Sequence, residues 1–224
     1  MGESHVIGIV LASRSPRRRE LLTRAGIRFR IIEPPDDVAL PAGVSAELAV
    51  QLVARQKAVA VAKVVPAGTY VLSADTIVVG PRGPLGKPRT PELAREMLND
   101  LRGKRHTVLT GVCALCTETD HEALGVSRSA VKFCDFTDDA LDMYVASGEP
   151  LDRAGAYAIQ GGGSDFVEAV AGRIDTVIGL DVGLALRLLG EIGYPDPLPR
   201  TTDINLTASR QRRPLAPLRT VTRV

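Results

Sequence analysis

The chain has 224 residues, a mass of 23.8 kDa and a formal net charge of +2, with 45% hydrophobic and 24% charged residues. This balance is typical of a folded globular protein and excludes an intrinsically disordered chain, while three cysteines argue against a disulfide framework. No apolar run approaches the ~18 residues of a transmembrane helix, and the first residues lack the basic start of a secretion signal. We therefore expect a cytoplasmic protein with no membrane partner.

Positive charge is concentrated at the C-terminal end of the chain. From Arg200 onward, six arginines stand against one aspartate, Asp203, which gives this end +5 and leaves −3 for residues 1–199. A slightly acidic folded part argues against nucleic-acid binding as the main function. Residues 196–224 also lack helical or strand periodicity, so we predict one domain over 1–195 and a disordered basic tail over 196–224.

Apolar periodicity predicts strands and helices in alternation through the first half of the chain and neighbouring antiparallel strands after it. The predicted strands are residues 5–13, 29–34, 70–80, 106–118 and 122–136, and the predicted helices are residues 15–26, 45–65, 90–103, 137–148 and 181–193. Segment 81–88 predicts a hairpin-like connection, and the glycine-rich stretch 152–172 shows little regular periodicity. Together these elements predict an α/β domain with a mixed sheet.

Two cysteines form a C-x-x-C sequence, Cys113 and Cys116, inside an apolar segment with strand character. Residues three apart on a strand point to opposite faces of the sheet, and no second cysteine pair accompanies them. We therefore interpret both as core residues rather than as a metal or redox site.

The sequence lacks the motifs of several common catalytic sites. It contains no His-Glu-x-x-His, no Walker loop, no G-x-G-x-x-G after the first strand and no G-x-S-x-G. Its three histidines, His5, His106 and His121, are scattered, and we interpret each as a surface or strand residue. A site of carboxylates, cations and backbone amides remains, which is the combination that handles phosphates.

The turn from the first strand into the first helix, SRSPRRRELL, is the first candidate site. A helix N-terminus stabilises an anion, whereas arginines in a first helical turn are otherwise unfavourable. The polar residues of this turn are Ser13, Arg14, Ser15, Arg17, Arg18 and Arg19. An anion site and a solvated basic face both remain open for this pattern alone.

Asp75 and Thr76, within the apolar segment 70–80, form the second candidate. A carboxylate inside an apolar strand is costly unless it is paired, hydrogen-bonded or bound to a metal. Reactive groups of α/β folds also lie where a strand end opens into a loop. The alternative is that Asp75 only caps a neighbouring helix or satisfies nearby loop amides.

Two lysines and a glycine-rich loop supply further candidates. Lys87 lies between Gly86 and a proline, and Lys57 lies on an apolar helix, where it either reaches water or points into a polar cleft. The segment from Glu149 carries Arg153 and Gln160, and the Gln160 side-chain amide could read a nucleobase edge because it both donates and accepts hydrogen bonds. A demanding loop without a ligand is the alternative for this segment.

Taken together, these segments resemble the Maf family of nucleoside triphosphate pyrophosphatases over roughly residues 9–193. LASRSPRRRELL is similar to the family's LASxSPRRxELL, SADTIVV to its ADT-containing strand and LGKP to its G-K-P turn. ARQKAVAVA resembles its lysine-bearing helix, and MLNDLRGKRHTVLTGV its ML-LSG-H-V-T-V segment. SGEPLDRAGAYAIQGGG is close to EPxDKAGAYGIQGxG and favours the dTTP/UTP branch over the 7-methyl-GTP branch.

The resemblance implies a fold shared with the inosine-triphosphate pyrophosphatases, with an elongated mixed sheet flanked by helices, two lobes and a central cleft. It implies a homodimer that hydrolyses a nucleoside triphosphate to the monophosphate and pyrophosphate with Mg²⁺ or Mn²⁺. Asp75 matches the family's proton acceptor and a metal ligand, and Arg17, Thr76 and Gln160 match positions associated with specificity. The positions implied to bind phosphate or substrate are Ser13, Arg14, Ser15, Arg18, Lys57, Lys87 and Arg153.

Three positions depart from the family pattern. In the loop after the second strand, Asp37 is followed by Val38 where a second carboxylate is usual, so that carboxylate is missing unless Asp36 and Asp37 shift to serve. Arg153 stands in place of the usual lysine, and Asp181 in place of a proline, where we predict that it caps the last helix.

The predicted reaction is in-line attack of water on the α-phosphorus, with Asp75 as general base. An inosine-triphosphate-type purine specificity on the same fold is one alternative, and a catalytically weakened nucleotide-binding regulator is another. Association with nucleic acid through the basic tail is a third.

Overall fold

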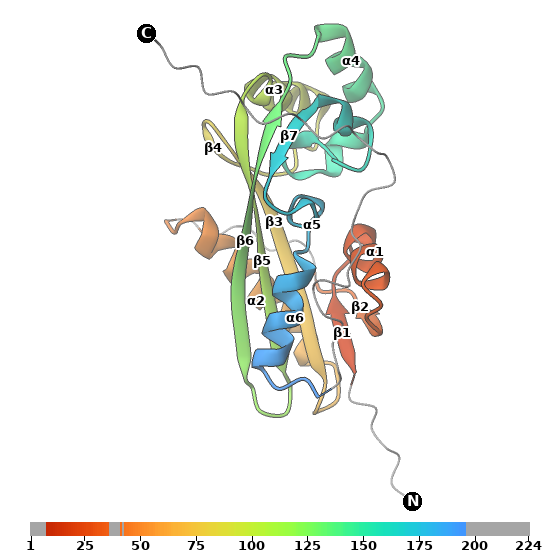
Figure 1. Cartoon of the computed structure of the whole chain (residues 1–224), viewed down its shortest axis with the longest axis vertical. Helices are drawn as coiled ribbons and strands as arrows, with labels where there is room; N and C mark the ends of the chain where they lie inside the picture. The colour runs from red at the N-terminus through yellow and green to blue at the C-terminus, as the bar shows by residue number, and fades with distance from the viewer. Residues whose placement is uncertain (1–7, 36–40, 42, 196–224) are drawn as a thin grey trace, which may run out of the picture.

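A computed structural model describes residues 8–35, 41 and 43–195 (Figure 1). The strands are β1 (Ile9–Ala12), β2 (Phe29–Ile32), β3 (Tyr70–Gly80), β4 (Gly83–Leu85), β5 (Arg105–Cys116), β6 (Glu122–Phe133) and β7 (Val167–Ala171). The α-helices are α1 (Pro16–Arg24), α2 (Ala46–Ala62), α3 (Pro91–Leu101), α4 (Asp138–Ala146), α5 (Ile174–Ile178) and α6 (Val182–Glu191). Short 3-10 helices follow α4: η1 (Glu149–Asp152), η2 (Ala154–Ala156) and η3 (Gly162–Phe166).

The strands form one mixed sheet with the order β2-β1-β3-β5-β6-β7, and β4 pairs with β3 beside this path. β1 is parallel to β2 and β3, whereas β5 is antiparallel to both β3 and β6. The predicted α/β class with a mixed sheet is therefore confirmed, as is the hairpin-like connection through β4.

The strands β3, β5 and β6 run the length of the molecule (Figure 1). Different helices cover the sheet at its two ends. At one end, α1 and α6 pack on one face around Leu22, Leu72 and Leu188, and α2 packs on the other through Ala54. At the other end, α3, α4 and η3 surround Phe133 in a separate core. The packing at these two ends of the sheet defines the two expected lobes.

Local sequence explains where several helices begin. The side chains of Ser45, Thr90, Thr137 and Asp181 each accept a backbone N–H in the first turn of the helix that follows. The prediction that Asp181 caps the last helix is confirmed. Ser15 occupies the N-cap position of α1, but its side chain accepts no such hydrogen bond.

One strand is not predicted by the sequence pattern. The stretch 152–172 shows little regular periodicity, yet Val167–Ala171 within it forms β7 and pairs with the end of β6. Five residues, of which two are exposed and three half-buried, are too short a segment for strand alternation to stand out from the glycine-rich surroundings. The cysteine interpretation holds, because Cys113 and Cys116 are buried in cores on opposite faces of the sheet.

Among the described helices, none combines the length and the apolar character that crossing a membrane requires. The predicted basic tail, residues 196–224, lies outside the described residues, as do Asp36, Asp37 and Val38.

Candidate active site

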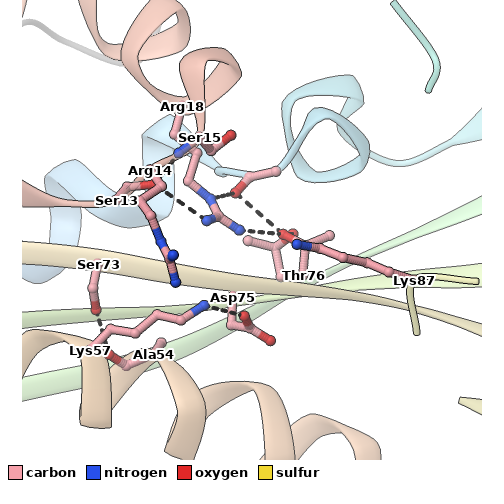
Figure 2. A network of polar contacts seen from close by, with 12 residues as sticks. Ser13, Arg14, Ser15, Arg18, Ala54, Lys57, Ser73, Asp75, Thr76 and Lys87 are labelled. Atoms are coloured by element: carbon pink, nitrogen blue, oxygen red, sulfur yellow. Dashed lines mark hydrogen bonds and ion pairs between the residues drawn. The ribbon is translucent and has the colours of Figure 1, made fainter. Parts of the chain in front are cut away.

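A cavity of about 450 Å³ opens where the β1–α1 turn faces the middle of β3 and residues from both lobes meet (Figure 2). The predicted site residues that line it are Ser13, Arg14, Ser15, Arg17, Arg18, Lys57, Asp75, Thr76, Lys87, Arg153 and Gln160. Asp37, the remaining predicted residue, lies outside the described part of the chain. The cavity thus joins segments up to 167 positions apart in sequence, from Ala12 to Gly179.

The β1–α1 turn is organised by a buried hydroxyl. Ser13 Oγ accepts the backbone N–H of Ser15 at 3.1 Å, and Ser13 is only 2% exposed. The first turn of α1 contains no acidic side chain, so nothing on the helix itself neutralises the partial positive charge of its N-terminus. The turn has the polarity that an anion requires.

Arg18 connects three walls of the cavity. Its Nε donates to the carbonyl of Gly179 at 2.7 Å, and its Nη2 donates to Thr76 Oγ1 at 3.1 Å. Its Nη1 reaches Ser13 Oγ at 3.5 Å, a long contact. Figure 2 shows the guanidinium between the turn and β3. Arg18 therefore fixes the relative position of α1, β3 and the loop that follows α5.

The Thr76 hydroxyl belongs to a chain of buried hydrogen bonds. It lies 3.0 Å from Thr110 Oγ1 on β5, and Thr110 in turn donates to the carbonyl of Thr176 at 2.8 Å. Because Thr110 uses its only proton on that carbonyl, the single Thr76 proton goes to Thr110 Oγ1 or to the Gly179 carbonyl 3.3 Å away, and Thr76 accepts from Arg18. The chain orients Thr76 within the cavity wall.

Asp75 is paired with Lys57. Lys57 Nζ donates to Asp75 Oδ1 at 2.6 Å, and the two side chains are only 11% and 17% exposed. Of the two alternatives for Lys57, the cleft is the one observed. Within the described part of the chain, Asp75 Oδ2 accepts no hydrogen bond, so this oxygen stays available for another partner.

Of the four arginines with a buried donor that lacks an acceptor among the described residues, two line the cavity and two, Arg19 and Arg102, lie outside it. Arg17 Nη1 and Arg153 Nε are both buried and have no hydrogen-bond partner among the described residues. Burial lowers the pKa of the Arg17 guanidinium, and the neighbouring cations Arg153 and Arg18 lower it further. A ligand anion between Arg17 and Arg153 would satisfy these donors and offset the repulsion.

The cavity also contains residues that the sequence analysis did not single out. Asp152 Oδ1 lies 2.9 Å from Lys87 Nζ, and Tyr157 lines the wall with its hydroxyl 2.9 Å from His106 Nε2. His106 is a strand residue, as one reading of it allowed, but it is buried at 3% exposure. Asp152 and Tyr157 lie in the motif-bearing segment that suggested Arg153 and Gln160, which is the signal that could have identified them.

The described residues offer a metal ion little on their own. They contain no group of three or more histidine, cysteine or acidic side chains placed to hold a metal. Asp75 supplies a single carboxylate, of which one oxygen accepts no hydrogen bond from the described residues. Mg²⁺ is commonly bound through one or two carboxylates, water and the phosphates of a substrate. The site therefore fits a divalent ion that shares its ligands with a phosphate-bearing substrate.

Similar proteins cover nearly all of the folded chain. The family model described as "Maf-like protein" matches residues 8–192. A protein named dTTP/UTP pyrophosphatase from Anaeromyxobacter dehalogenans is 45% identical over 86% of this chain and 97% of its own. Its namesake from Myxococcus xanthus is 46% identical over 84% of this chain and 94% of its own. One from a Geobacillus strain is 42% identical over 83% and 98%.

A solved dITP/XTP pyrophosphatase from Mycobacterium abscessus overlaps with a TM-score of 0.37 at 14% identity, over 57% of this chain and 73% of that one. That overlap is too small to bear on function.

The architecture and the cavity define an α/β protein with a cleft lined by cations. The chain belongs to the Maf-like protein family.

Proposed function

We propose that the protein is a nucleoside triphosphate pyrophosphatase that hydrolyses dTTP and UTP to the monophosphate and pyrophosphate. The observation that carries the proposal is the Asp75 carboxylate, held by Lys57 at one oxygen, in a cavity that also contains six cationic side chains. The cations are Arg14, Arg17, Arg18, Lys57, Lys87 and Arg153. The names of the relatives at 42–46% identity support the same activity and the same substrates.

The phosphates bind against the cationic wall. The N-terminus of α1, the hydroxyl of Ser13, Arg153 and Lys87 all line the cavity. The buried donors Arg17 Nη1 and Arg153 Nε take phosphate oxygens as acceptors, which they lack within the described protein. This arrangement stabilises the negative charge that builds up on the leaving pyrophosphate.

Asp75 acts on the attacking water. Lys57 holds Oδ1 at 2.6 Å and orients the carboxylate, and Oδ2 accepts the proton of a water molecule. The water oxygen forms a bond to the α-phosphorus while the bond to the bridging oxygen breaks, and pyrophosphate leaves with that oxygen. The products are a nucleoside monophosphate, pyrophosphate and a proton that Asp75 later releases.

A divalent ion, Mg²⁺ or Mn²⁺, would be held by Asp75 together with phosphate oxygens, and when bound it supplies additional positive charge next to the reacting phosphate. Asp37 is the further ligand we propose from its position in the sequence. The residues of this chain still orient the carboxylate and bind the phosphates in the way described above.

The base lies at the glycine-rich loop. Gln160 is exposed at the rim of the cavity and offers an amide that both donates to and accepts from a pyrimidine edge. Thr76 and Arg17 also contribute to substrate specificity, because they lie next to the base and the sugar-phosphate in this arrangement. In this arrangement the loop selects thymine or uracil.

Pyrophosphate release from dTTP, UTP, CTP, ITP and 7-methyl-GTP, with Mg²⁺ and with Mn²⁺, tests the proposal. We expect the highest kcat/KM for dTTP and UTP. Faster hydrolysis of ITP would overturn the pyrimidine assignment in favour of a purine enzyme. Binding of dTTP without turnover of any nucleotide would indicate a regulator instead of an enzyme.

The remaining proposals concern the organisation of the protein. Residues 1–195 form the catalytic domain, the basic segment 196–224 is dispensable for catalysis, and the protein works as a cytoplasmic homodimer. A chain that ends at residue 195 should keep its turnover, and sedimentation should give twice the monomer mass.

A further inference from the structure

Gln160 has no anchor of its own in the described structure. Its side chain is exposed, and it forms no hydrogen bond with any described residue. A long, flexible side chain that is to recognise one base edge must be placed by the backbone that carries it, because freedom lost on binding lowers affinity. The position of the loop around Gln160 is therefore the feature that needs an explanation.

Two backbone N–H groups, one on each side of Gln160, are held by side chains from outside the loop. The N–H of Ala158 donates to the Tyr144 hydroxyl at 3.2 Å. The N–H of Gly162 donates to Glu149 Oε2 at 3.0 Å. Tyr144 lies on α4 and Glu149 on η1. The loop is therefore fixed to α4 at residue 158 and to η1 at residue 162.

The two anchors also contact each other. The Tyr144 hydroxyl lies 3.4 Å from Glu149 Oε1, a long hydrogen bond in which the phenol donates. Burial raises the pKa of Tyr144 to about 12, so the hydroxyl keeps its proton. The Tyr144 ring packs edge-on against Phe166 with centroids 5.2 Å apart, which fixes the phenol in the core of its lobe.

The glycines of the loop are required by this arrangement. A Cβ built on Gly161 would overlap the Glu149 carboxylate, and one on Gly163 would lie 2.8 Å from the Tyr144 hydroxyl. Only glycine lets the backbone come this close to the two anchors. The glycine run next to Gln160 thus has a specific structural cause.

We propose that Tyr144 and Glu149 are positioning residues for base recognition, which hold the loop on both sides of Gln160 so that its amide is presented to a pyrimidine. The proposal rests on the proposed function, because it assigns Gln160 to the base. Neither anchor lines the cavity. Their loss should therefore reduce discrimination between bases more than it reduces turnover of a nucleotide that does not use Gln160.

The test measures kcat/KM for dTTP and for ITP in the full-length protein and in Tyr144→Phe, Glu149→Ala and Glu149→Gln variants. Tyr144→Phe removes only the hydroxyl and keeps the buried ring. We expect Tyr144→Phe and Glu149→Ala to lower the dTTP/ITP ratio about tenfold, as the loss of one hydrogen bond allows. Glu149→Gln keeps an oxygen that accepts the N–H of Gly162, so its ratio should stay within about threefold of the parent.

Tyr70→Phe is the matched control. The Tyr70 hydroxyl donates to the carbonyl of Gly193 at 2.9 Å in the opposite lobe, so Tyr70→Phe also removes a phenol hydroxyl, whereas Tyr144→Phe removes its contacts with both Ala158 and Glu149. Its dTTP/ITP ratio should not change. Amide hydrogen exchange in residues 157–163 should accelerate in Tyr144→Phe and Glu149→Ala but not in Tyr70→Phe.

An equal loss for dTTP and ITP in the two anchor variants would overturn the proposal, because it would show a purely structural role. A Glu149→Gln variant as impaired as Glu149→Ala would overturn it too, since the charge of Glu149 would then matter and its acceptor oxygen would not. If the parent protein turns over no nucleotide, the proposed function fails separately. The same ratio is then measured from dissociation constants for dTTP and ITP by calorimetry, with the same two criteria.

Discussion

Lys57 Nζ lies 2.6 Å from Asp75 Oδ1, and this pair joins the middle of α2 to the middle of β3 inside the cavity. Both side chains are largely buried, so each charge depends on the other for compensation. The pair leaves the second carboxylate oxygen without a hydrogen bond from the described residues. Lys57 thus both permits a charged carboxylate on an apolar strand and fixes its direction.

Replacing Asp75 with asparagine should lower kcat at least about a hundredfold, because the amide cannot accept the proton of the attacking water. Affinity for the nucleotide should change far less, since the cationic wall remains in place. Pyrophosphate release measures the first quantity, and calorimetry with dTTP measures the second.

The Asp152→Asn variant is the control for this experiment. Asp152 is another carboxylate of the cavity that is paired with a lysine, but its side chain is 77% exposed. We expect its kcat to stay within about threefold of the parent, as for a surface ion pair of small energy. An Asp75→Asn variant that turns over as fast as Asp152→Asn would exclude Asp75 as the base.

The sequence predicted most of the candidate site because its residues lie in short motifs at the ends of strongly patterned elements. Arg17 and Arg18 lie in the first turn of the helix that follows an apolar strand, and Asp75 interrupts another apolar strand. Motifs of this kind identify a side chain and its element, but they do not specify its partner across the fold. The sequence left open whether the Lys57 side chain reaches water or a cleft. The packing of α2 against β3, which places Lys57 beside Asp75, decides for the cleft.

The contacts that hold the site together could not be predicted in the same way. Thr110 and Thr176 are ordinary threonines in sequence, and only the register of β5 against β3 places Thr110 opposite Thr76. Such supporting contacts depend on strand register over distances of tens of residues, which no local pattern records.

The Thr110→Val variant tests the chain of buried hydroxyls. Valine keeps the shape of threonine but leaves the carbonyl of Thr176 without its donor and Thr76 without an acceptor in Thr110. We expect the free energy of unfolding to fall by about 1–3 kcal/mol and the KM for dTTP to rise, because Thr76 and Arg18 lose their fixed position.

Ser129→Ala separates these two effects. Ser129 Oγ donates to the carbonyl of Arg173 at 2.8 Å, outside the cavity. Ser129→Ala therefore removes the hydroxyl donor of a backbone carbonyl next to α5, as Thr110→Val does for the carbonyl of Thr176 within α5. Denaturant unfolding should show a similar loss of stability in both variants. A KM that rises equally in both would mean that Thr110 contributes only stability.

His106 should make the stability of the protein depend on pH. Burial lowers its pKa from about 6.5 to about 4, so the folded state favours the neutral imidazole while the unfolded state binds a proton below about pH 6.5. This contribution to stability is therefore complete above about pH 6.5 and is lost as the pH falls toward 4. Between pH 7.5 and pH 5.0 the loss should be about 2 kcal/mol.

His106→Phe should remove that part of the pH dependence. Phenylalanine suits the surrounding rings of Phe133 and Tyr157, whose centroids lie 4.8 and 5.4 Å from that of the imidazole. The variant loses the hydrogen bond to the Tyr157 hydroxyl at both pH values, so that cost cancels in the comparison. If the difference in unfolding free energy between pH 7.5 and 5.0 is the same in variant and parent, His106 is not the group responsible.

Arg153 offers the most direct test of how the cavity binds phosphate. Its Nε is buried without an acceptor among the described residues, and its charge lowers the pKa of the neighbouring Arg17, so a bound anion relieves an unfavourable state of the free protein. Arg153→Met should therefore raise the KM for dTTP at least about tenfold. Arg153→Lys keeps the positive charge, and lysine is the usual residue at this position in the family. Its KM for dTTP should lie between those of the parent and Arg153→Met. Both KM values are measured at low and high salt, because screening weakens the purely Coulombic part of the effect. Equal KM values in Arg153→Met and the parent at low salt would show that Arg153 does not bind the substrate.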